Sequence, residues 1–365
     1  MDLKKADNTF SKINNRHVDS EFSLTDDRAV VTAKSDGKLD LWINLSPIVE
    51  YEISSLEDLL RQELSKGNPF VSKEAIRLLK SGGKRIRPLF TILFSMLGDS
   101  YNSRQAIFTA AAIETMHMAT LIHDDTIDNA KKRRGIDTTF EKHGIHTAVY
   151  TGDWMFVKSL QLLSNTNDDT PIKSELLNLL AKSLESVCDG ELDQYYGRGV
   201  IPGISTYYKR IKGKTAAMFT AACISGAKIA NLSEEQVKIA KSFGENFGIG
   251  FQILDDLIDV ESTIEIAGKP VKNDLNEGII TLPVIMACKK SKEYRHKVKA
   301  YLENPSSISL CEIRDAAILS EGINMAKKEC RKYVDLCYSD LDLLPDRMAQ
   351  GEIRNILDKV FVTIL

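Results

Sequence analysis

The feature that most constrains the fold is an acidic triplet that occurs twice, each time at the end of an apolar segment. The first copy lies in LIHDDTID, residues 121–128, and the second in FQILDDLID, residues 251–259. Both copies place aspartates at i, i+1 and i+4: Asp124, Asp125 and Asp128, then Asp255, Asp256 and Asp259. Side chains at i and i+4 share one face of a helix. The sequence therefore predicts two helices, each of which ends with a pair of carboxylates on one face.

Helical spacing of apolar residues dominates from about residue 56 to the end of the chain. Residues 104–123 and 176–188 contain neither glycine nor proline and are predicted helices. Residues 237–260 keep the spacing but include Gly244, Gly248 and Gly250, which indicates close backbone packing. Helices that are apolar on most faces surround a cavity or lie inside a large bundle. We predict an all-α bundle of long helices around a central apolar cavity.

The first fifty residues follow a different pattern. The segments AVVTA and LDLWINL flank an Asp-Gly pair, which predicts a β-hairpin. No motif with a chemical role occurs there, and a surface extension or a dimer-contacting arm is the simplest interpretation. We divide the chain into an N-terminal extension, residues 1–50, and a helical domain, residues 51–365.

Composition excludes several classes of protein. The net charge is −3, from 48 basic and 51 acidic residues, so no global field attracts nucleic acid. Six cysteines without a CxxC pair indicate reduced thiols rather than a disulfide framework or a zinc site. No apolar run reaches the ~20 residues that a bilayer requires, and the first fifteen residues lack an apolar leader. We therefore expect a cytoplasmic protein.

The two acidic triplets predict a magnesium site. Carboxylates at this density repel one another unless a cation lies between them. Mg²⁺ takes oxygen ligands, often only one or two carboxylates, and completes its shell with water and substrate phosphates. A single triplet could be a solvated helix end, but two copies that each follow an apolar helix favour the metal site.

Basic motifs accompany both triplets. SGGKRIRP, residues 81–88, places Lys84, Arg85 and Arg87 at a predicted helix start, which favours an anion, although a solvated basic turn is the alternative. KKRRG places Arg133 and Arg134 directly after the first triplet, and arginine binds phosphate with two parallel hydrogen bonds. Acidic metal sites that alternate with basic residues along the chain indicate binding sites for two diphosphate groups.

Other polar residues share this spacing. His117 lies two helical turns before the first triplet, although a buried core histidine is the alternative. GKT and GKPVKNDL contribute Lys214 and Lys269, and Gln252 precedes the second acidic triplet by about one helical turn. GKT is not a nucleotide-binding P-loop, because the upstream GxxxxG spacing is missing. Apolar helices between two diphosphate sites indicate an apolar substrate.

Over residues 56–365 the sequence resembles the trans-isoprenyl diphosphate synthases, the polyprenyl synthetase family. The matching segments, in family order, are GGKRIRP, HMATLIHDDTID, RRG, YTGDWM, KGKT, GFQILDDLID and GKPVKNDLNEGIITLP. The similarity is greatest to medium- and long-chain members, including catalytic subunits of the hexaprenyl and heptaprenyl enzymes. It implies the isoprenoid synthase fold and a homodimer, or an active subunit that needs a small regulatory partner. It also implies at most peripheral membrane contact, for product release.

The resemblance implies roles for individual residues. Isopentenyl diphosphate would be bound by Lys84, Arg87, His117 and Arg134, with Phe251 packed against it. Two or three Mg²⁺ ions, replaceable by Mn²⁺, would be held by Asp124, Asp128 and Asp255, supported by Asp125, Asp256 and Asp259. The allylic diphosphate would be bound by Arg133, Lys214, Gln252 and Lys269. Thr215 and Gln252 would face the allylic cation.

Two departures from the family pattern stand out. Asp137 occupies the place of the proline in RRGxP, and Lys272 and Ile279 replace a glycine and a lysine in GKxxGxDLxxGKxTLP. These changes leave open how the segment after the second triplet closes, and whether Lys272 substitutes for the missing lysine.

The implied activity is condensation of isopentenyl diphosphate with an allylic diphosphate. Product length is predicted from the helix before Asp124, where Ala119 and Thr120 are small and Met116 is flexible. These residues predict a product of about thirty to thirty-five carbons, with a farnesyl or geranylgeranyl product as the alternative. Remote alternatives are a class I terpene cyclase and a non-catalytic synthase-like subunit.

Overall fold

A computed structural model describes residues 45–165, 171–261, 274–319 and 321–362. The chain divides into two units, residues 1–38 and 39–365, and every described residue belongs to the second. The predicted hairpin, Lys269 and Lys272 lie outside the described residues. The first described helix begins at Pro47, close to the predicted start of the helical domain at residue 51.

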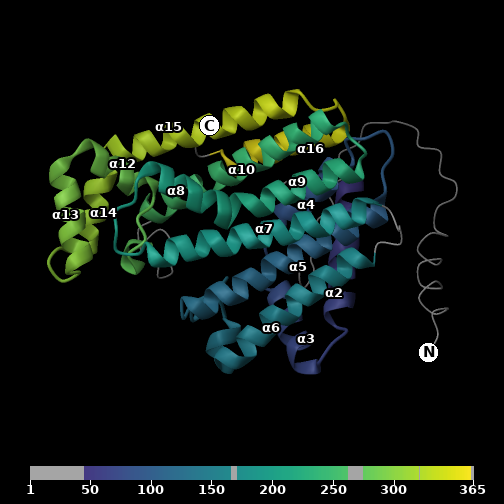
Figure 1. The fold of residues 1–365 in the computed structure, drawn as a ribbon, viewed down its shortest axis with the longest axis horizontal. Helices are drawn as coiled ribbons and strands as arrows, with labels where there is room; N and C mark the ends of the chain where they lie inside the picture. The colour runs from purple at the N-terminus through teal and green to yellow at the C-terminus, as the bar shows by residue number, and fades with distance from the viewer. Residues whose placement is uncertain (1–44, 166–170, 262–273, 320, 363–365) are drawn as a thin grey trace. The chain divides into compact units, whose positions relative to one another are not determined.

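The described chain is all-α, as predicted (Figure 1). Its α-helices are α2 (Pro47–Leu64), α3 (Pro69–Lys80), α4 (Ile86–Ser95), α5 (Ser103–Ile127), α6 (Thr139–Ser164), α7 (Pro171–Tyr196), α8 (Ile204–Ile211), α9 (Ala217–Ile229), α10 (Glu234–Glu261), α12 (Leu282–Lys290), α13 (Lys292–Glu303), α14 (Leu310–Leu319), α15 (Glu321–Asp342) and α16 (Met348–Val360). Within the described residues, the only strands are β1 (Lys132–Arg133) and β2 (Ile136–Asp137), which pair antiparallel. None of the described helices is long and apolar enough to cross a membrane.

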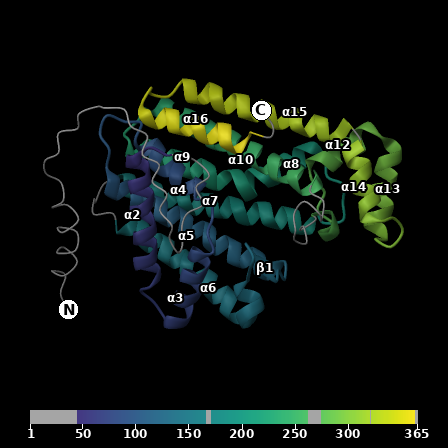
Figure 2. The same cartoon turned by 180° about the vertical axis from the view of Figure 1, so that it is seen from behind.

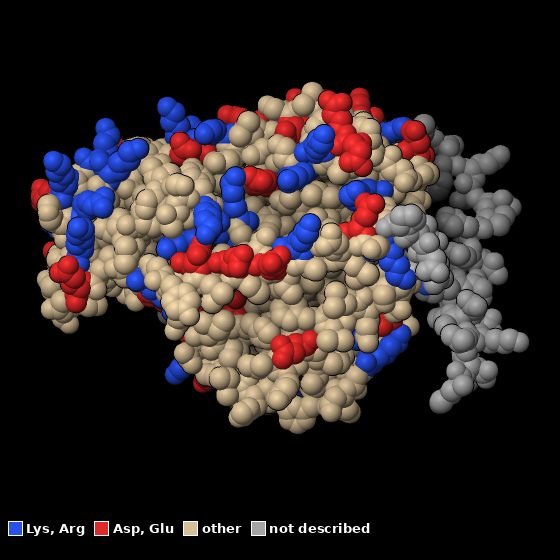
Figure 3. Space-filling view, viewed as in Figure 1, with Lys and Arg blue, Asp and Glu red and all other residues tan. Residues whose placement is uncertain are grey.

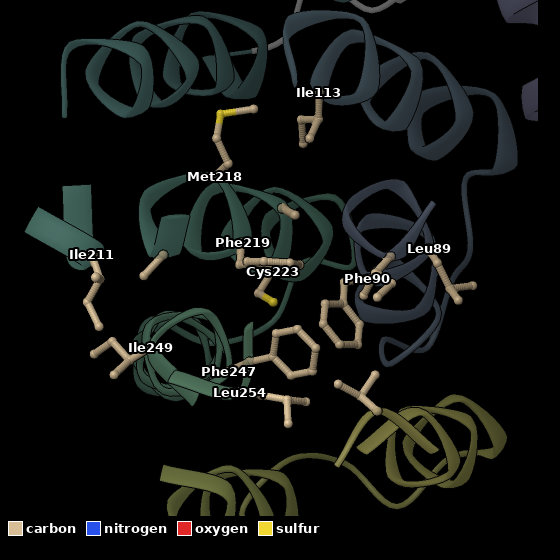
Figure 4. Packing of buried hydrophobic residues seen from close by; sticks show 14 of the residues in the cluster. Leu89, Phe90, Ile113, Ile211, Met218, Phe219, Cys223, Phe247, Ile249 and Leu254 are labelled. Atoms are coloured by element: carbon tan, nitrogen blue, oxygen red, sulfur yellow. The ribbon is translucent and has the colours of Figure 1, made fainter. Parts of the chain in front are cut away.

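The centre of the bundle consists of α4, α5, α9 and α10. Helix α10 packs between α9 and α15, α4 packs against α9, and α5 runs along α6, an arrangement that both faces of the molecule show (Figures 1 and 2). Phe90 and Phe247 meet edge to face, with ring centroids 4.7 Å apart, and Phe219 lies 4.9 Å from Phe247. Figure 4 shows these rings between the helices together with aliphatic side chains. This apolar core fixes the positions of α5 and α10, which carry the acidic triplets.

Two glycines of α10 allow close contact with α9 and the turn before it. A Cβ atom added to Gly244 would lie 2.7 Å from Thr220 Cα, and one on Gly248 would lie 2.4 Å from Ala216 Cα. Side chains cannot approach backbone atoms so closely, so glycine is required at both positions. The predicted close packing is confirmed for these two; Gly250 instead faces the ring of Phe361 at 3.4 Å.

Both acidic triplets end their helices, as the sequence predicts. Helix α5 begins after Asn102, whose side chain accepts a hydrogen bond from the Gln105 amide at 3.1 Å, and it ends at Ile127. Helix α10 continues two residues beyond the second triplet, to Glu261. All three aspartates of the second triplet therefore lie in a helix, whereas in the first triplet Asp128 is the C-cap residue that follows α5.

Candidate active site

A cleft of about 560 Å³ brings both triplets together. Helix α5 lines it with side chains three or four residues apart, and α10 lines it from another side: Glu114, His117, Leu121, Asp124 and Asp128, then Phe251, Gln252, Asp255 and Asp256. The spacing on α5 is that of one helical face. The prediction that His117 projects to the same side as the first triplet is confirmed.

A π-helical turn over Lys212–Ala216 shapes another wall of the cleft. Tyr207, Ile211, Thr215 and Phe219 all line the cleft at intervals of four residues. In a regular α-helix this interval drifts around the axis by about 40° per step. The wider π turn offsets this drift, and such turns are frequent at functional sites. The π turn therefore allows four side chains spaced four residues apart to face the cleft from this wall.

Three of the six predicted metal ligands line the cleft as candidates for direct metal contact: Asp124, Asp128 and Asp255. Asp128 also accepts a hydrogen bond from Arg198 Nη2 at 2.9 Å. Burial, and next the carboxylate of Glu191, raise the pKa of Asp124 to about 7, and burial raises the pKa of Asp255. Within the described residues no three carboxylate, histidine or cysteine side chains converge into a closed metal site. The arrangement fits Mg²⁺, which takes few protein carboxylates and fills its shell with water and phosphates.

The other three aspartates support the site through hydrogen bonds. Asp125 accepts from Arg133 Nε at 2.8 Å, and Asp259 accepts from the Asp274 amide at 3.3 Å. Asp256 accepts from the Tyr207 hydroxyl at 2.6 Å and from Gln252 Nε2 at 2.9 Å. Burial raises the pKa of Asp256 to about 8. Asp125 and Asp259 do not line the cleft, so the structure places them as supports for neighbouring groups.

The residues predicted to bind isopentenyl diphosphate come together on the wall formed by α4 and α5. Lys84, Arg87, His117 and Arg134 all line the cleft. Arg87 Nη1 lies 3.3 Å from His117 Nε2, and its guanidinium lies over Phe219, 4.1 Å from the ring centroid. Burial lowers the pKa of Arg87 to about 10, and burial together with Arg87 lowers the pKa of His117. His117 is therefore neutral, a hydrogen-bonding group beside a cluster of cations.

Arg134 is positioned by the loop before α4. Its guanidinium donates to the carbonyl oxygen of Gly82. A Cβ atom on Gly83 would lie 2.8 Å from Arg134 Nη1, so the arginine crosses the loop where glycine leaves room for it. This contact joins the GGK and RRG motifs, which are about fifty residues apart in the sequence.

Arg85, in the same basic motif, has a different position. Its side chain is buried, and its guanidinium donates to Glu57 Oε1 at 2.8 Å, to Glu114 Oε1 at 2.9 Å and to the Leu79 carbonyl at 2.9 Å. The backbone of Arg85 has φ 47°, an uncommon value for a residue other than glycine. Arg85 borders the cleft as Lys84 and Arg87 do, but these bonds pair its buried guanidinium with protein groups.

The residues predicted to face the allylic cation also meet. Thr215 Oγ1 donates to Gln252 Oε1 at 2.6 Å. Lys214 forms an ion pair with Glu191 at 2.9 Å, and Arg133 lines the cleft while it is paired with Asp125. Phe251 lines the cleft and packs against Phe219, with ring centroids 5.5 Å apart.

The predicted chain-length residues lie beside the cleft and do not line it. Met116 and Ala119 are buried in the core, and Thr120 is half-buried, with its hydroxyl bonded to the His117 carbonyl. Ala119 lies one turn before His123, whose ring contacts Gly152 of α6. Ala119 therefore lies on the side of α5 that faces α6.

Sequence analysis missed several charged residues near the cleft. Glu114 lies beneath the basic wall, and Glu191 pairs with Lys214. Arg198 bonds Asp128 Oδ1 at 2.9 Å, and the adjacent Gly199 amide donates to the Gly278 carbonyl at 2.8 Å. Arg198 is the middle residue of a GRG segment, residues 197–199. Its two glycines flanking an arginine, between the acidic and the lysine motifs, were the available sign of a second basic loop.

Comparison with known proteins identifies the family. A family model described as polyprenyl synthetase matches residues 68–313. The chain belongs to the polyprenyl synthetase family. It is an enzyme that transfers prenyl groups.

Several members of the polyprenyl synthetase family are similar over nearly their whole length. Heptaprenyl diphosphate synthase component 2 of Bacillus subtilis is 32% identical over 331 residues, which cover 88% of this chain and 93% of that protein. Nonaprenyl diphosphate synthase of Mycobacterium tuberculosis is 29% identical, covering 84% and 90%. The crystal structure of heptaprenyl diphosphate synthase from Staphylococcus aureus superposes with a TM-score of 0.78 at 31% identity, covering 86% and 97%.

Proposed function

We propose that the chain condenses isopentenyl diphosphate with an allylic diphosphate and releases a trans-polyprenyl diphosphate of about thirty to thirty-five carbons. The observation that carries this proposal is one cleft with carboxylates from two helix ends facing a cationic wall and apolar rings. Similarity to heptaprenyl synthases supports the length. Similarity to geranylgeranyl diphosphate synthase of Sulfolobus acidocaldarius, 31% identical over 78% of this chain, keeps a shorter product as the second candidate.

The protein would act mainly on the charge that develops as the allylic substrate ionises. The C1–O bond breaks, and both bonding electrons leave with the diphosphate. Mg²⁺, held by Asp124, Asp128 and Asp255, would supply positive charge at that leaving group. Lys214 would add to it after exchanging Glu191 for a phosphate oxygen.

The second substrate would supply the new bond. Lys84, Arg87 and Arg134 would hold its diphosphate, with neutral His117 as a hydrogen-bonding partner. Its double bond attacks the allylic cation beside Phe251, a proton passes to the departed diphosphate, and a new double bond forms. The Thr215–Gln252 pair would face the cation with oxygen dipoles. No dedicated protein base is needed.

The test is a condensation assay with the purified chain. With Mg²⁺, isopentenyl diphosphate and a fifteen-carbon allylic diphosphate, we expect products near thirty to thirty-five carbons by chromatography, and none in EDTA. Parallel reactions with cell extract ask whether a small partner chain is needed, as the name "component 2" of the Bacillus relative suggests. A cyclic hydrocarbon made from the allylic substrate alone would contradict the proposal and favour a terpene cyclase.

Product length should change when Ala119 is replaced by phenylalanine. The tail would extend along α5 away from Asp124, at ~1.5 Å per residue, so bulk at the fully buried Ala119 should stop it early. Ala119→Phe should shift the product to fifteen or twenty carbons while the first condensation persists. Thr120→Val keeps side-chain volume and should leave the distribution unchanged. Chromatography measures the product lengths, and a melting curve shows whether the variant is folded. An unchanged product distribution in a folded Ala119→Phe variant would contradict the assignment of α5 as the element that limits product length.

Helix α6 offers a surface for a second copy of this chain. Its outer face exposes apolar side chains: Ile145, Val149, Tyr150, Val157 and Leu160. Figure 3 shows few charged side chains where Figure 1 places α6. Exposed apolar patches of this kind mark interaction sites. We expect sedimentation to show a dimer for the natural chain and a monomer for Val157→Glu, with Lys182→Glu on α7 as the control. A monomeric natural chain would contradict this assignment.

We propose the cytoplasm as the cellular location of the chain, and the state of its cysteines supports this. The five cysteines whose side chains are described are free: Cys188, Cys223, Cys288, Cys330 and Cys337. Free thiols support the cytoplasm as the compartment.

A further inference from the structure

Arg210 is a cation of the cleft wall to which the sequence motifs assign no role. It lies in the last turn of α8, directly before the π turn, and lines the cleft with Gln194 and Lys214. The wall that holds it is distinct from the one with Lys84, Arg87 and Arg134. Arg210 is therefore on the side of the cleft where the allylic diphosphate is proposed to bind.

The neighbouring cations each have a carboxylate partner. Lys214 pairs with Glu191 at 2.9 Å, Arg198 with Asp128 at 2.9 Å, and Lys209 with Asp193 at 2.7 Å. In Figure 3, acidic side chains follow the position of α7 and basic ones that of α8. Around α7 and α8, positive charge is thus generally balanced by a close negative charge.

Arg210 lacks such a partner. Across the described residues no carboxylate lies within ion-pairing distance of its guanidinium, and its Nε atom is buried without a hydrogen-bond partner. The carboxylate of Asp193 is ion-paired with Lys209 and influences Arg210 only by a longer-range electrostatic interaction. Burial lowers the pKa of Arg210. A partly buried cation without a counterion is unfavourable, and an anion in the cleft would relieve this cost.

The Arg210 side chain packs against the GRG loop, residues 197–199, at Gly197. A Cβ atom on Gly197 would lie 1.8 Å from Arg210 Nη2 and 2.7 Å from its Cζ. The guanidinium therefore rests directly on the backbone of the loop, in space that only glycine leaves open. The contact with Gly197 places the partly buried guanidinium at the edge of the cleft.

We propose that Arg210 binds the diphosphate of the allylic substrate, together with Lys214, and that Gly197 positions it. The inference rests on the proposed function and adds a residue to that site. A guanidinium offers two parallel hydrogen bonds to phosphate oxygens, which a lysine cannot reproduce. Because the diphosphate leaves with an added negative charge, the contact strengthens as the C1–O bond breaks.

Steady-state kinetics test the assignment. Arg210→Gln should raise the KM for the allylic diphosphate by ~10-fold or more and lower kcat, while the KM for isopentenyl diphosphate changes less than about twofold. Arg210→Lys should recover part of the loss. Lys209→Gln removes the adjacent, exposed cation and should resemble the natural enzyme. An unchanged allylic KM, or a selective rise in the KM for isopentenyl diphosphate, would overturn the proposal.

A binding measurement separates this proposal from the activity. Calorimetry with inorganic diphosphate and Mg²⁺ should show ~10-fold weaker binding to Arg210→Gln and Gly197→Ala than to Lys209→Gln. Because both changes act on one contact, the double variant should bind no more weakly than Arg210→Gln alone. Additive losses would reject Gly197 as the positioning residue. If the natural chain binds diphosphate through Arg210 but forms no product, the proposed function fails and this site stands.

The Gly197→Ala variant needs a folding control. The new Cβ atom would also lie 2.9 Å from the Asp193 carbonyl oxygen, so the loop itself has to shift slightly. Melting curves and circular dichroism should match those of Arg210→Gln. If Gly197→Ala is unfolded, Arg210→Gln and Arg210→Lys still decide the role of the guanidinium.

Discussion

Replacing Asp124 or Asp255 by asparagine should lower turnover by ~10²–10³-fold or more while the fold stays intact. Both carboxylates line the cleft, one from each triplet, where the proposed Mg²⁺ and diphosphate would meet. Asparagine keeps the shape of the side chain and removes the charge that the cation needs. Condensation assays over a range of Mg²⁺ concentrations measure the effect. Turnover that persists in either variant at low Mg²⁺ would contradict the assignment.

Two controls separate loss of chemistry from loss of fold. Asp259→Asn changes the same triplet at a side chain that does not line the cleft, so its effect on turnover should be smaller. Burial raises the pKa of Asp124, which means that its ionised form destabilises the native state without a cation. At pH 8 without metal, Asp124→Asn should therefore melt at the same temperature as the natural chain or higher. A lower melting temperature would indicate a structural role.

Periodicity made the helices and triplets predictable, because it depends on local geometry alone. The predicted segments 104–123 and 176–188 lie inside α5 and α7, which extend beyond them at both ends. His117 and Asp124 share a face because seven residues make two turns. The π turn at Lys212–Ala216 was not predictable in this way, since it depends on how α8 and α9 pack against α7 and α10.

Partners distant in the sequence were harder to predict. The aspartates of each triplet are chemically identical, yet Asp125 is bonded to Arg133 and does not line the cleft. Asp256 lines the cleft but is bonded to Tyr207, and Asp124 and Asp255 face the cleft. Helical periodicity determines the side of the helix end on which each aspartate lies. The residue that each aspartate contacts depends on how other elements pack against that helix end. Arg198 and Arg210 illustrate the same point, because their roles depend on the loop that joins α7 to α8.

Arg85 and Lys84 offer a sharper case, in which adjacent cations of one motif should give opposite phenotypes. Arg85→Met should destabilise the fold by ~3–5 kcal/mol, because it leaves Glu57 and Glu114 buried without their shared counterion. Lys84→Met removes an exposed cleft residue and should change stability by no more than about 0.5 kcal/mol. Chemical unfolding measures both. Lys84→Met should instead raise the KM for isopentenyl diphosphate.

A second change shows whether the buried charges cause the loss in Arg85→Met. Glu114→Gln in that background removes one of the two uncompensated carboxylates and should restore part of the stability, although Glu114→Gln alone should be destabilising. The left-handed backbone at position 85 gives an independent check. Arg85→Gly relieves that backbone strain and still removes the charge, so it should remain strongly destabilised. If Arg85→Gly is as stable as the natural chain, strain outweighs the ion pairs, and the buried cluster does not hold α4 against α2 and α5.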